Sequence, residues 1–280
     1  MDLTTFIQQA LVEDIGDGDH TTLASIPSHA TGSARMIVKE KGIIAGIEIA
    51  PRIFDQIDSN LAIRILKTEG EVVKKGDIIL TVQGSVHSIL KAERLVLNIM
   101  QRMSGIATTT RNYVDQIKGT QAKVLDTRKT TPGFRFFEKE AVRIGGGFNH
   151  RFGLFDMILI KDNHIDYAGD VTNAIKSVQK YLTATGKQLQ VEIEARSLED
   201  VANILETGGV NRIMLDNFSP ELLKKAVKMI SGACETEASG GINLENIRQY
   251  AETGIDFISV GALTHSYKSL DISLKAIIDH

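Results

Sequence analysis

Leu189-Gln-Val-Glu-Ile-Glu194 is a short apolar, β-branched run that ends in a carboxylate, and it decides the fold because it repeats. Three similar runs follow it, namely Arg212-Ile-Met-Leu-Asp216, Thr236-Glu-Ala-Ser239 and Phe257-Ile-Ser-Val-Gly261. The four runs recur about every 22 residues, the length of one compact strand–helix unit, and helical patterns lie between them. Such alternation predicts a parallel sheet of buried strands.

Two earlier runs extend the series, Lys123-Val-Leu-Asp-Thr-Arg128 and Met157-Ile-Leu-Ile-Lys161. Each run ends in a charged, polar or glycine residue, so the chemistry collects at the strand ends. Six such units favour a closed or nearly closed α/β barrel over residues 108–266. In barrels the active site lies at the C-terminal ends of the strands.

Residues 1–107 have a mixed pattern that predicts a separate α/β sandwich domain. We expect helices at 2–13, 46–57 and from near 88, and strands at 33–39, 61–67 and 78–82. The tail at 270–278 fits either a strand or a helix, and 267–280 is expected to complete this first domain. No role can be assigned to the acidic loop at 13–19.

The segment Glu69-Gly-Glu-Val-Val-Lys-Lys-Gly-Asp-Ile-Ile-Leu80 looks like part of a lipoyl or biotinyl carrier module. It lacks the exposed lysine between small hydrophobic residues that carrier attachment needs. A hairpin within the sandwich is therefore the favoured interpretation.

Composition excludes several classes of protein. The net charge is −3, so no global basic field points to nucleic acid. Cys234 is the one cysteine, which excludes an internal disulfide and a cysteine-rich metal site and is typical of a reducing cytoplasm. At the entry to a strand, Cys234 fits a packing role better than that of a nucleophile. We expect no secretion signal and no membrane span.

The stretch from Asp126 to Lys161 is locally basic, with seven positive and four negative residues. Lys139 and Arg143 fit a solvated helix face. Arg128, Lys129 and Lys161 lie at strand ends, where a charge is costly to desolvate unless an anion pairs with it. These three side chains indicate a site for an anionic small molecule.

Carboxylates lie at two neighbouring strand ends. Glu192 and Glu194 share one face of their strand, and Glu194 is nearer the barrel mouth. With Asp216 it could bind ribose hydroxyls, hold Mg²⁺ or stabilise positive charge. The alternative for Asp216 is an N-cap of the next helix.

Glycine loops follow the last two strands, Ser239-Gly240-Gly241 and Gly261-Ala-Leu-Thr-His265. Glycines let backbone N–H groups approach phosphate oxygens, so this pair of loops predicts a monophosphate site. His150 and Arg151 follow three glycines. They fit either a mobile loop with a solvated histidine or a lid that brings two donors to a carboxylate.

These segments together resemble the quinolinate phosphoribosyltransferase family along nearly the whole chain. The residues that carry the resemblance are Ala92-Glu-Arg-Leu-Val-Leu-Asn98, Ser104-Gly-Ile-Ala-Thr108, Asp126-Thr-Arg-Lys-Thr-Thr-Pro-Gly133, Gly145-Gly-Gly-Phe-Asn-His-Arg151, Ile160-Lys-Asp-Asn-His164, Leu215-Asp-Asn217, Ala238-Ser-Gly-Gly241 and Val260-Gly-Ala-Leu-Thr-His265.

The resemblance implies an open-faced α/β sandwich beside an incomplete, TIM-like α/β barrel, in a homodimer or larger homo-oligomer with a shared active site. It implies that quinolinate and phosphoribosyl pyrophosphate (PRPP) react to nicotinate mononucleotide, pyrophosphate and CO₂ in NAD biosynthesis. Mg²⁺ would arrive mainly on PRPP, and Glu194 and Asp216 could add ligands. The resemblance implies a quinolinate site formed by Arg94 from the partner subunit, Arg128, Lys129, His150, Arg151 and Lys161, where Lys129 serves either quinolinate or the pyrophosphate. It implies Glu194 and Asp216 as the residues for the ribose. The residues implied for the 5′-phosphate are Ser239, Gly240, Gly241, Gly261 and His265.

Three alternatives stay open at this point. A molybdenum-associated relative would keep the fold and change the substrate. A Schiff-base aldolase would use Lys161 at its strand end. A sensor would bind the phosphate metabolite without turnover.

Overall fold

The computed structural model describes residues 2–278 and falls into two compact units. The sandwich unit groups the chain up to Thr109 with Phe136–Gly145 and the segment from Tyr267 onward. The barrel unit contains Thr110–Arg135 and Gly146–Ser266. The expected domain boundary at residue 107 falls inside one continuous helix, α4 (Val86–Gln116). The position of the boundary therefore stays a prediction.

The sandwich unit is built on an antiparallel sheet with the strand order β12-β1-β5-β3. Its strands are β1 (Thr31–Val38), β3 (Ala62–Ile65), β5 (Ile78–Ser85) and β12 (Ile272–Ile277). Met36 lies opposite Leu80 on one side and Leu274 on the other, and all three are buried. The next row is Arg35, Thr81 and Lys275, which points to the opposite face. The sheet therefore has one apolar and one polar face.

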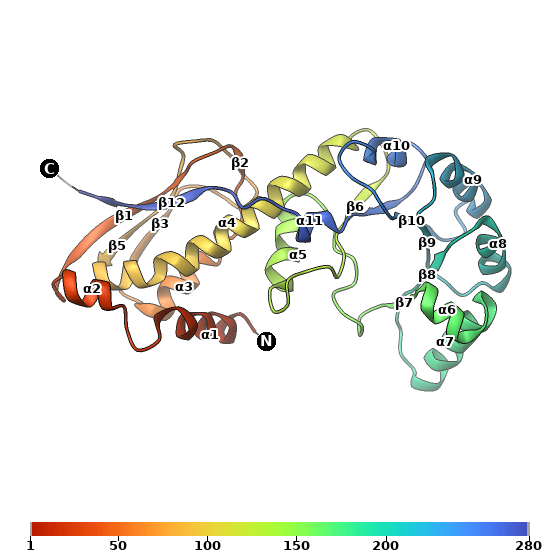
Figure 1. Ribbon diagram of the computed structural model, residues 1–280, viewed down its shortest axis with the longest axis horizontal. Helices are drawn as coiled ribbons and strands as arrows, with labels where there is room; N and C mark the ends of the chain where they lie inside the picture. The colour runs from red at the N-terminus through yellow and green to blue at the C-terminus, as the bar shows by residue number, and fades with distance from the viewer. Residues whose placement is uncertain (1, 279–280) are drawn as a thin grey trace. The chain divides into compact units, whose positions relative to one another are not determined.

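Helices of this unit cover the apolar face, as Figure 1 shows for α1 to α4. They are α1 (Leu3–Ile15), α2 (His20–Ser25), α3 (Ala50–Ile57) and the first part of α4, with α5 (Arg135–Ile144) grouped in the same unit. Asp2 and Asp19 begin α1 and α2 as N-caps. The C-terminal tail is a strand, β12, beside β1 (Figure 1), which settles the choice left open by its sequence.

The expected hairpin at 69–80 is wrong. β4 (Val72–Val73) pairs with β2 (Gly42–Ile43) in a small sheet of its own, while β5 lies between β1 and β3. The turn at Gly76, with φ 94°, redirects the chain from one sheet to the other.

Lys139 also differs from expectation. Its side chain is buried on α5 together with Phe137 and Glu138, whereas Arg143 is exposed and pairs with Glu140. Glu138 is completely buried and forms an ion pair with Arg102 of α4. The buried face of this helix is thus partly ionic, which a simple apolar period does not reveal.

The barrel unit holds a parallel sheet with the order β6-β11-β10-β9-β8-β7. Its strands are β6 (Lys123–Leu125), β7 (Ile158–Ile160), β8 (Val191–Ala195), β9 (Arg212–Asp216), β10 (Glu235–Ser239) and β11 (Phe257–Ser259). All six coincide with the expected runs. β6 and β7 are the two edges and do not pair with each other, so the barrel is incomplete, as expected.

Helices alternate with these strands, as the βα rhythm predicts. They are α6 (Asp162–Ala168), α7 (Val171–Thr185), α8 (Leu198–Thr207), α9 (Pro220–Ile230), α10 (Ile247–Ala251) and α11 (Ala262–His265). Asp170, Ser197 and Ser219 cap α7, α8 and α9 through their side-chain oxygens. Among the described residues no helix has the length and apolar character required to cross a bilayer.

Candidate active site

A cavity of about 480 Å³ lies at the C-terminal ends of the parallel strands of the barrel unit. Each strand of the sheet, or the turn after it, supplies at least one lining residue. The lining residues are Thr127, Arg128, Lys129, His150, Arg151, Leu159, Lys161, Asp162, Glu194, Met214, Asp216, Glu237, Ser239 and Ser259. Eight of the thirteen sequence-derived site residues thus meet in one cavity.

The two-residue period of the strands explains why these side chains face inward. On β8 Glu192 and Glu194 share the inner face, with Glu194 nearer the strand end, as expected. On β10 the same period puts Glu237 below Ser239. The inner face therefore carries an upper layer at the cavity wall and a lower, fully buried layer, Glu192 and Glu237, of which Glu237 forms part of the cavity floor.

Arg128 and Arg151 give the cavity an uncompensated positive side. Neither guanidinium forms an ion pair with a carboxylate among residues 2–278, and the buried Nε of Arg128 has no hydrogen-bond partner there. Burial lowers the pKa of Arg151, and repulsion from Arg128 lowers it further. Nη1 of Arg151 donates to the Met157 carbonyl at 3.2 Å, which leaves its charge uncompensated. Two close cations without a carboxylate partner in the described chain are suited to bind a dianion.

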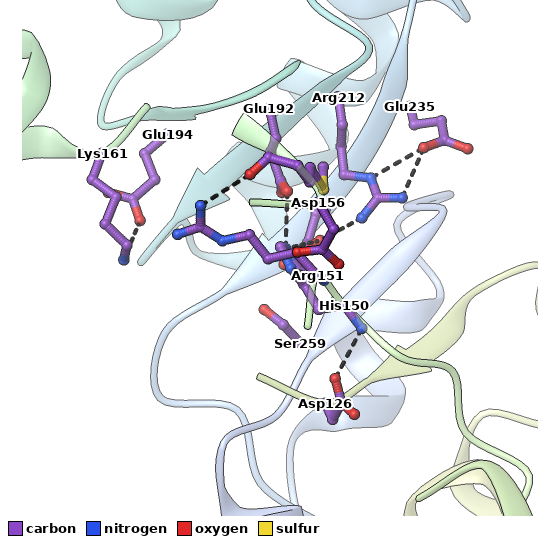
Figure 2. Close-up of polar contacts among 12 residues, drawn as sticks. Asp126, His150, Arg151, Asp156, Lys161, Glu192, Glu194, Arg212, Glu235 and Ser259 are labelled. Carbon is purple, nitrogen blue, oxygen red and sulfur yellow. Dashed lines mark hydrogen bonds and ion pairs between the residues drawn. The ribbon is translucent and has the colours of Figure 1, made fainter. Parts of the chain in front are cut away.

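Lys161 also lines the cavity and contacts the carboxylate of Glu194 on the neighbouring strand. Its Nζ is 3.1 Å from Oε1 of Glu194, and the other oxygen of Glu194 accepts from the N–H of Asp162 at 3.0 Å. The Lys161 side chain remains half exposed. Figure 2 shows this pair apart from the buried group around His150.

Asp216 ends β9 with an oxygen available to a ligand. Its Oδ2 accepts from the side chain of Asn217 at 2.7 Å, and Oδ1 has no hydrogen-bond partner in the described chain. The N-cap alternative is wrong, because Ser219 caps α9. Burial raises the pKa of Asp216, and the neighbouring Glu194 carboxylate adds to the increase.

The glycine loops follow β10 and β11 at the cavity end of the sheet, where Ser239 is the residue of these loops that lines the cavity. Gly240 has φ 97°, and a Cβ there would lie 2.1 Å from Oδ1 of Asn217, so only glycine fits. A Cβ on Gly261 would lie 3.0 Å from Cδ of Lys129 and 3.1 Å from Nε2 of His265. Gly261, Lys129 and His265 therefore lie close together. Lys129 and Ser239 line the cavity, whereas Gly240, Gly241, Gly261 and His265 do not.

A buried polar group forms the floor of the cavity, and sequence reasoning named His150 and Glu192 but missed Glu237 and Arg212, which complete the group. Nε2 of His150 is 2.9 Å from Oε2 of Glu192 and 3.6 Å from Oε2 of Glu237. Arg212 reaches the same place, with Nη1 3.1 Å from Glu237 and Nη2 2.8 Å from Glu235 (Figure 2). The solvated-histidine alternative is wrong, since the His150 side chain is only 6% exposed.

Burial dominates the titration of the two carboxyls in this group. It raises the pKa of Glu192 to about 7, against the opposing charge of Arg212. It raises the pKa of Glu237 to about 8, and the charge of Glu192 adds to the increase. The period of β10 could have revealed Glu237, because it lies two residues before Ser239 on the same face.

Two further residues lie outside this cavity. Arg94 is exposed on α4, in the sandwich unit, and forms no ion pair or hydrogen bond among the described residues. Cys234 directly precedes β10 and is half-buried, and burial raises the pKa of its thiol. A raised thiol pKa disfavours the nucleophilic thiolate.

A second cavity, of about 590 Å³, opens at the opposite ends of the strands. Two of its polar lining residues bond to each other, since Gln121 donates to Asp256 at 3.2 Å, and Asp256 also accepts from Thr236. Ligands of parallel sheets bind at the carboxyl ends of the strands, so we place the site in the first cavity.

Residues 19–104 match the family of the quinolinate phosphoribosyl transferase N-terminal domain, and residues 106–275 match that of the C-terminal domain. The chain belongs to the quinolinate phosphoribosyltransferase family. It is 47% identical to the chloroplastic nicotinate-nucleotide pyrophosphorylase [carboxylating] of Arabidopsis thaliana, over 98% of this chain and 82% of that protein. It is 41% identical to a probable nicotinate-nucleotide pyrophosphorylase [carboxylating] of Bacillus subtilis, over 100% of this chain and 95% of that protein.

The crystal structure of NadC from Streptococcus pyogenes has the same fold, with a TM-score of 0.93, 39% identity, and coverage of 99% of this chain and 97% of that one. The family assignment confirms the expected fold class, a sandwich domain with an antiparallel sheet followed by a parallel α/β domain. In this phosphoribosyltransferase fold the cavity at the strand ends is the candidate active site.

Proposed function

We propose that this chain transfers the phosphoribosyl group of PRPP to quinolinate and releases nicotinate mononucleotide, pyrophosphate and CO₂. The observation that carries the proposal is the positive side of the cavity, where Arg128 and Arg151 have no carboxylate partner in the described chain. Quinolinate brings two carboxylates to this position. Bidentate contacts from arginine fix the orientation of a carboxylate as well as its charge.

Lys129, His150 and Lys161 complete the proposed quinolinate pocket. Lys161 contacts Glu194 in the absence of substrate and is half exposed, so it can exchange that contact for a substrate carboxylate. Lys129 lies near Gly261 and His265, a position from which it can serve either quinolinate or the pyrophosphate.

The opposite side of the cavity suits the sugar phosphate. Asp216 offers a free oxygen to the ribose hydroxyls, and Glu194 lies beside it. The residues proposed to hold the 5′-phosphate are Ser239, Gly240, Gly241, Gly261 and His265.

The chemistry follows from these charges. The pyridine nitrogen forms a bond to C1 of the ribose while the bond from C1 to pyrophosphate breaks. Carboxylates near the ribose stabilise the positive charge that develops there. The bond between C2 and its carboxylate then breaks, its electron pair stays on C2 beside the cationic nitrogen, and C2 takes up a proton. No covalent protein nucleophile is needed.

Mg²⁺ fits this proposal as part of the PRPP substrate. Asp216 is the residue that would hold it, through the oxygen that no chain group occupies. Glu194 could add a ligand through Oε1 once Lys161 exchanges its contact for a substrate carboxylate, while Oε2 stays bonded to the N–H of Asp162. The group of His150, Glu192 and Glu237 has ligand atoms within 4.8 Å of one another. It does not fit, because Mg²⁺ prefers several oxygens and waters and Arg212 adjoins Glu237.

We further propose a homodimer or larger homo-oligomer in which Arg94 of one subunit reaches the cavity of another. Arg94 is exposed and without an ion pair in the described chain, which leaves its charge available to a partner's ligand. The cytoplasmic location also stays a prediction, because plant relatives are named as chloroplastic or mitochondrial.

The test is a turnover assay with quinolinate, PRPP and Mg²⁺, followed by ultraviolet absorbance and by pyrophosphate release. Product should form with quinolinate and not when nicotinate replaces it. Failure with quinolinate, together with turnover of another acceptor, would favour the molybdenum-associated alternative. Borohydride trapping of a carbonyl compound on Lys161 would favour the aldolase, and tight binding without turnover would favour the sensor.

A further inference from the structure

The buried group beneath the cavity contains more acid than base. Glu192 and Glu237 are both fully buried, and Arg212 is the one arginine or lysine among residues 2–278 that forms an ion pair with either, through Glu237. Arg212 divides its guanidinium between Glu237 and the half-exposed Glu235. Two carboxylates in a dry interior repel each other and lose their hydration, so the pair retains a proton unless a second cation compensates.

His150 is the obvious second cation, but its hydrogen bonding does not allow that charge. Nδ1 of His150 accepts from the backbone N–H of Arg151 at 2.7 Å. An imidazolium carries a proton on both nitrogens and cannot accept there. The remaining proton is therefore on Nε2, which faces the two carboxyls at 2.9 and 3.6 Å.

We propose that Glu192 and Glu237 share one proton, keep His150 as the neutral Nε2–H imidazole, and thereby act as positioning residues for the substrate pocket. This proposal rests on the proposed function for its effect on quinolinate, but not for the proton itself. Burial, the largest cause of the raised pKa of each carboxyl, favours a proton retained on the pair. Because the two groups interact, the shared proton belongs to the pair and not to one residue.

The position of Arg151 depends on this arrangement. The N–H of His150 donates to Oδ1 of the buried Asp126 at 2.8 Å, and the ring of His150 accepts from the next N–H in the chain. His150 is thus fixed through its backbone and through Nδ1, while Nε2 lies 2.9 Å from Glu192 (Figure 2). The backbone of Arg151 is fixed with it, and from there the guanidinium lines the cavity.

Loss of the shared proton should disturb the pocket. The groups that face the pair are Arg212 on β9, Glu194 on β8, Ser259 on β11, and His150 and Arg151 between α5 and β7. A second negative charge in the pair attracts the guanidinium of Arg151 away from the substrate. Quinolinate should therefore bind more weakly as pH rises through the titration of the pair.

The raised pKa of the carboxyl pair also makes the stability of the folded chain depend on pH. The carboxyl that keeps its proton has a higher pKa in the folded chain than in the unfolded chain. Its contribution is fully present below the unfolded value near 4.5 and is lost as pH rises through about 7 to 8. The melting temperature of the wild-type protein should fall across that range.

The test compares Glu192→Gln with the wild type and with Glu235→Gln as the matched control. Glutamine at 192 keeps a neutral hydrogen-bonding group and leaves one carboxylate beside Arg212. We expect its melting temperature to vary less between pH 6 and 9 than that of the wild type. Glu235→Gln makes the same chemical change on the exposed side of Arg212 and should follow the wild type. A fall in Glu192→Gln equal to that in the wild type would overturn the proposal.

Two further readouts separate this proposal from the proposed function. In ¹⁵N-histidine spectra, with the His150 signals assigned from their loss in His150→Gln, Nδ1 should be unprotonated at pH 6.5. An imidazolium there refutes the proposal whether or not the protein uses quinolinate. Calorimetric quinolinate binding should weaken above pH 8 in the wild type and much less in Glu192→Gln. If no quinolinate binds at any pH, the proposed function fails, and the melting and nitrogen data still decide the proton.

Discussion

Nζ of Lys161 lies 3.1 Å from Oε1 of Glu194, at the ends of the neighbouring strands β7 and β8. This pair joins the side of the cavity that suits a carboxylate substrate to the side that suits a ribose. Lys161 is half exposed, whereas Glu194 is nearly buried, so the lysine is the mobile partner. The pair therefore neutralises Glu194 when the cavity is empty and leaves the lysine free to meet an anion.

This relationship predicts non-additive effects in a double-mutant cycle. Lys161→Ala removes a substrate contact and also leaves Glu194 as an unpaired charge near Asp216. We expect it to lower kcat/KM at least about 100-fold, or about 2.7 kcal/mol. Lys161→Ala/Glu194→Gln should lose less activity than the sum of the two single changes, by about 1 kcal/mol. Strict additivity would show that the contact has no energetic role.

Arg128 should carry a large share of substrate recognition. Arg128→Ala removes one of two cations that lack a carboxylate partner in the described chain, and kcat/KM should fall at least about 100-fold. Arg143→Ala is the control, since Arg143 is an exposed helix residue paired with Glu140. Steady-state kinetics with varied quinolinate distinguish them, and wild-type rates in Arg128→Ala would remove this residue from the site.

Protonation of Asp216 should lower kcat/KM at the acidic end of its pH profile. Asp216 accepts ribose hydroxyls as a carboxylate, so activity should decline as pH falls through its pKa, which burial and Glu194 raise above the ordinary value of 3.8. Glu194→Gln removes one of those influences and should move the limb of kcat/KM to lower pH. Asp166→Asn is the control, because Asp166 is exposed and paired with Arg196. A limb that stays in place in Glu194→Gln would contradict this account.

If Arg94 serves the site of a partner subunit, two inactive variants should recover activity when they form mixed dimers. Arg94→Ala and Arg128→Ala should each be nearly inactive alone if every site needs one residue from each of two subunits. Co-refolding of the two variants should restore about a quarter of wild-type activity. About half of the dimers that form at random are mixed, and one of the two sites in each mixed dimer keeps both residues. Activity that does not rise on mixing would argue that Arg94 serves no partner's site.

The returning strand β12 predicts a matched pair of stability effects. Leu274 is 7% exposed and lies beside Met36 on the apolar face, so Leu274→Ala should cost about 2 to 4 kcal/mol. Lys275 follows it on the polar face, and Lys275→Ala should cost about 0.5 kcal/mol or less. Denaturant unfolding measures both, and equal losses would mean that the two faces of the sheet are not distinct.

The upper layer of the site could be predicted from the sequence because its residues follow the strands. The charged residues of this layer end apolar runs, and they are Arg128, Lys161, Glu194 and Asp216. At the ends of buried strands a charged side chain needs a partner or a ligand, which a residue on an exposed surface does not. Part of the lower layer was missed for a related reason. Glu237 lies inside its run, and a carboxyl there looks like an interruption of a strand until His150 and Arg212, distant in sequence, are seen to approach it.

Other errors have local causes. The chain at 69–80 has the spacing of a hairpin, but β4 pairs with β2, and only long-range pairing determines that choice. Lys139 follows the charged pattern of an exposed helix, yet it is buried beside Glu138, which Arg102 from α4 neutralises. Periodicity reports which face is apolar, and it does not report a buried charge that a distant residue compensates.

The pairing of β12 with β1 also sets an order of events during synthesis. β1 leaves the ribosome early, whereas its edge partner β12 is made after all six barrel strands. Until β12 has been synthesised, the backbone groups along that edge of β1 have no strand to bond, and they can recruit strands of other chains. The sandwich unit can therefore be complete only after the barrel strands have been synthesised, so a chain stalled before residue 272 should be prone to aggregate through this edge.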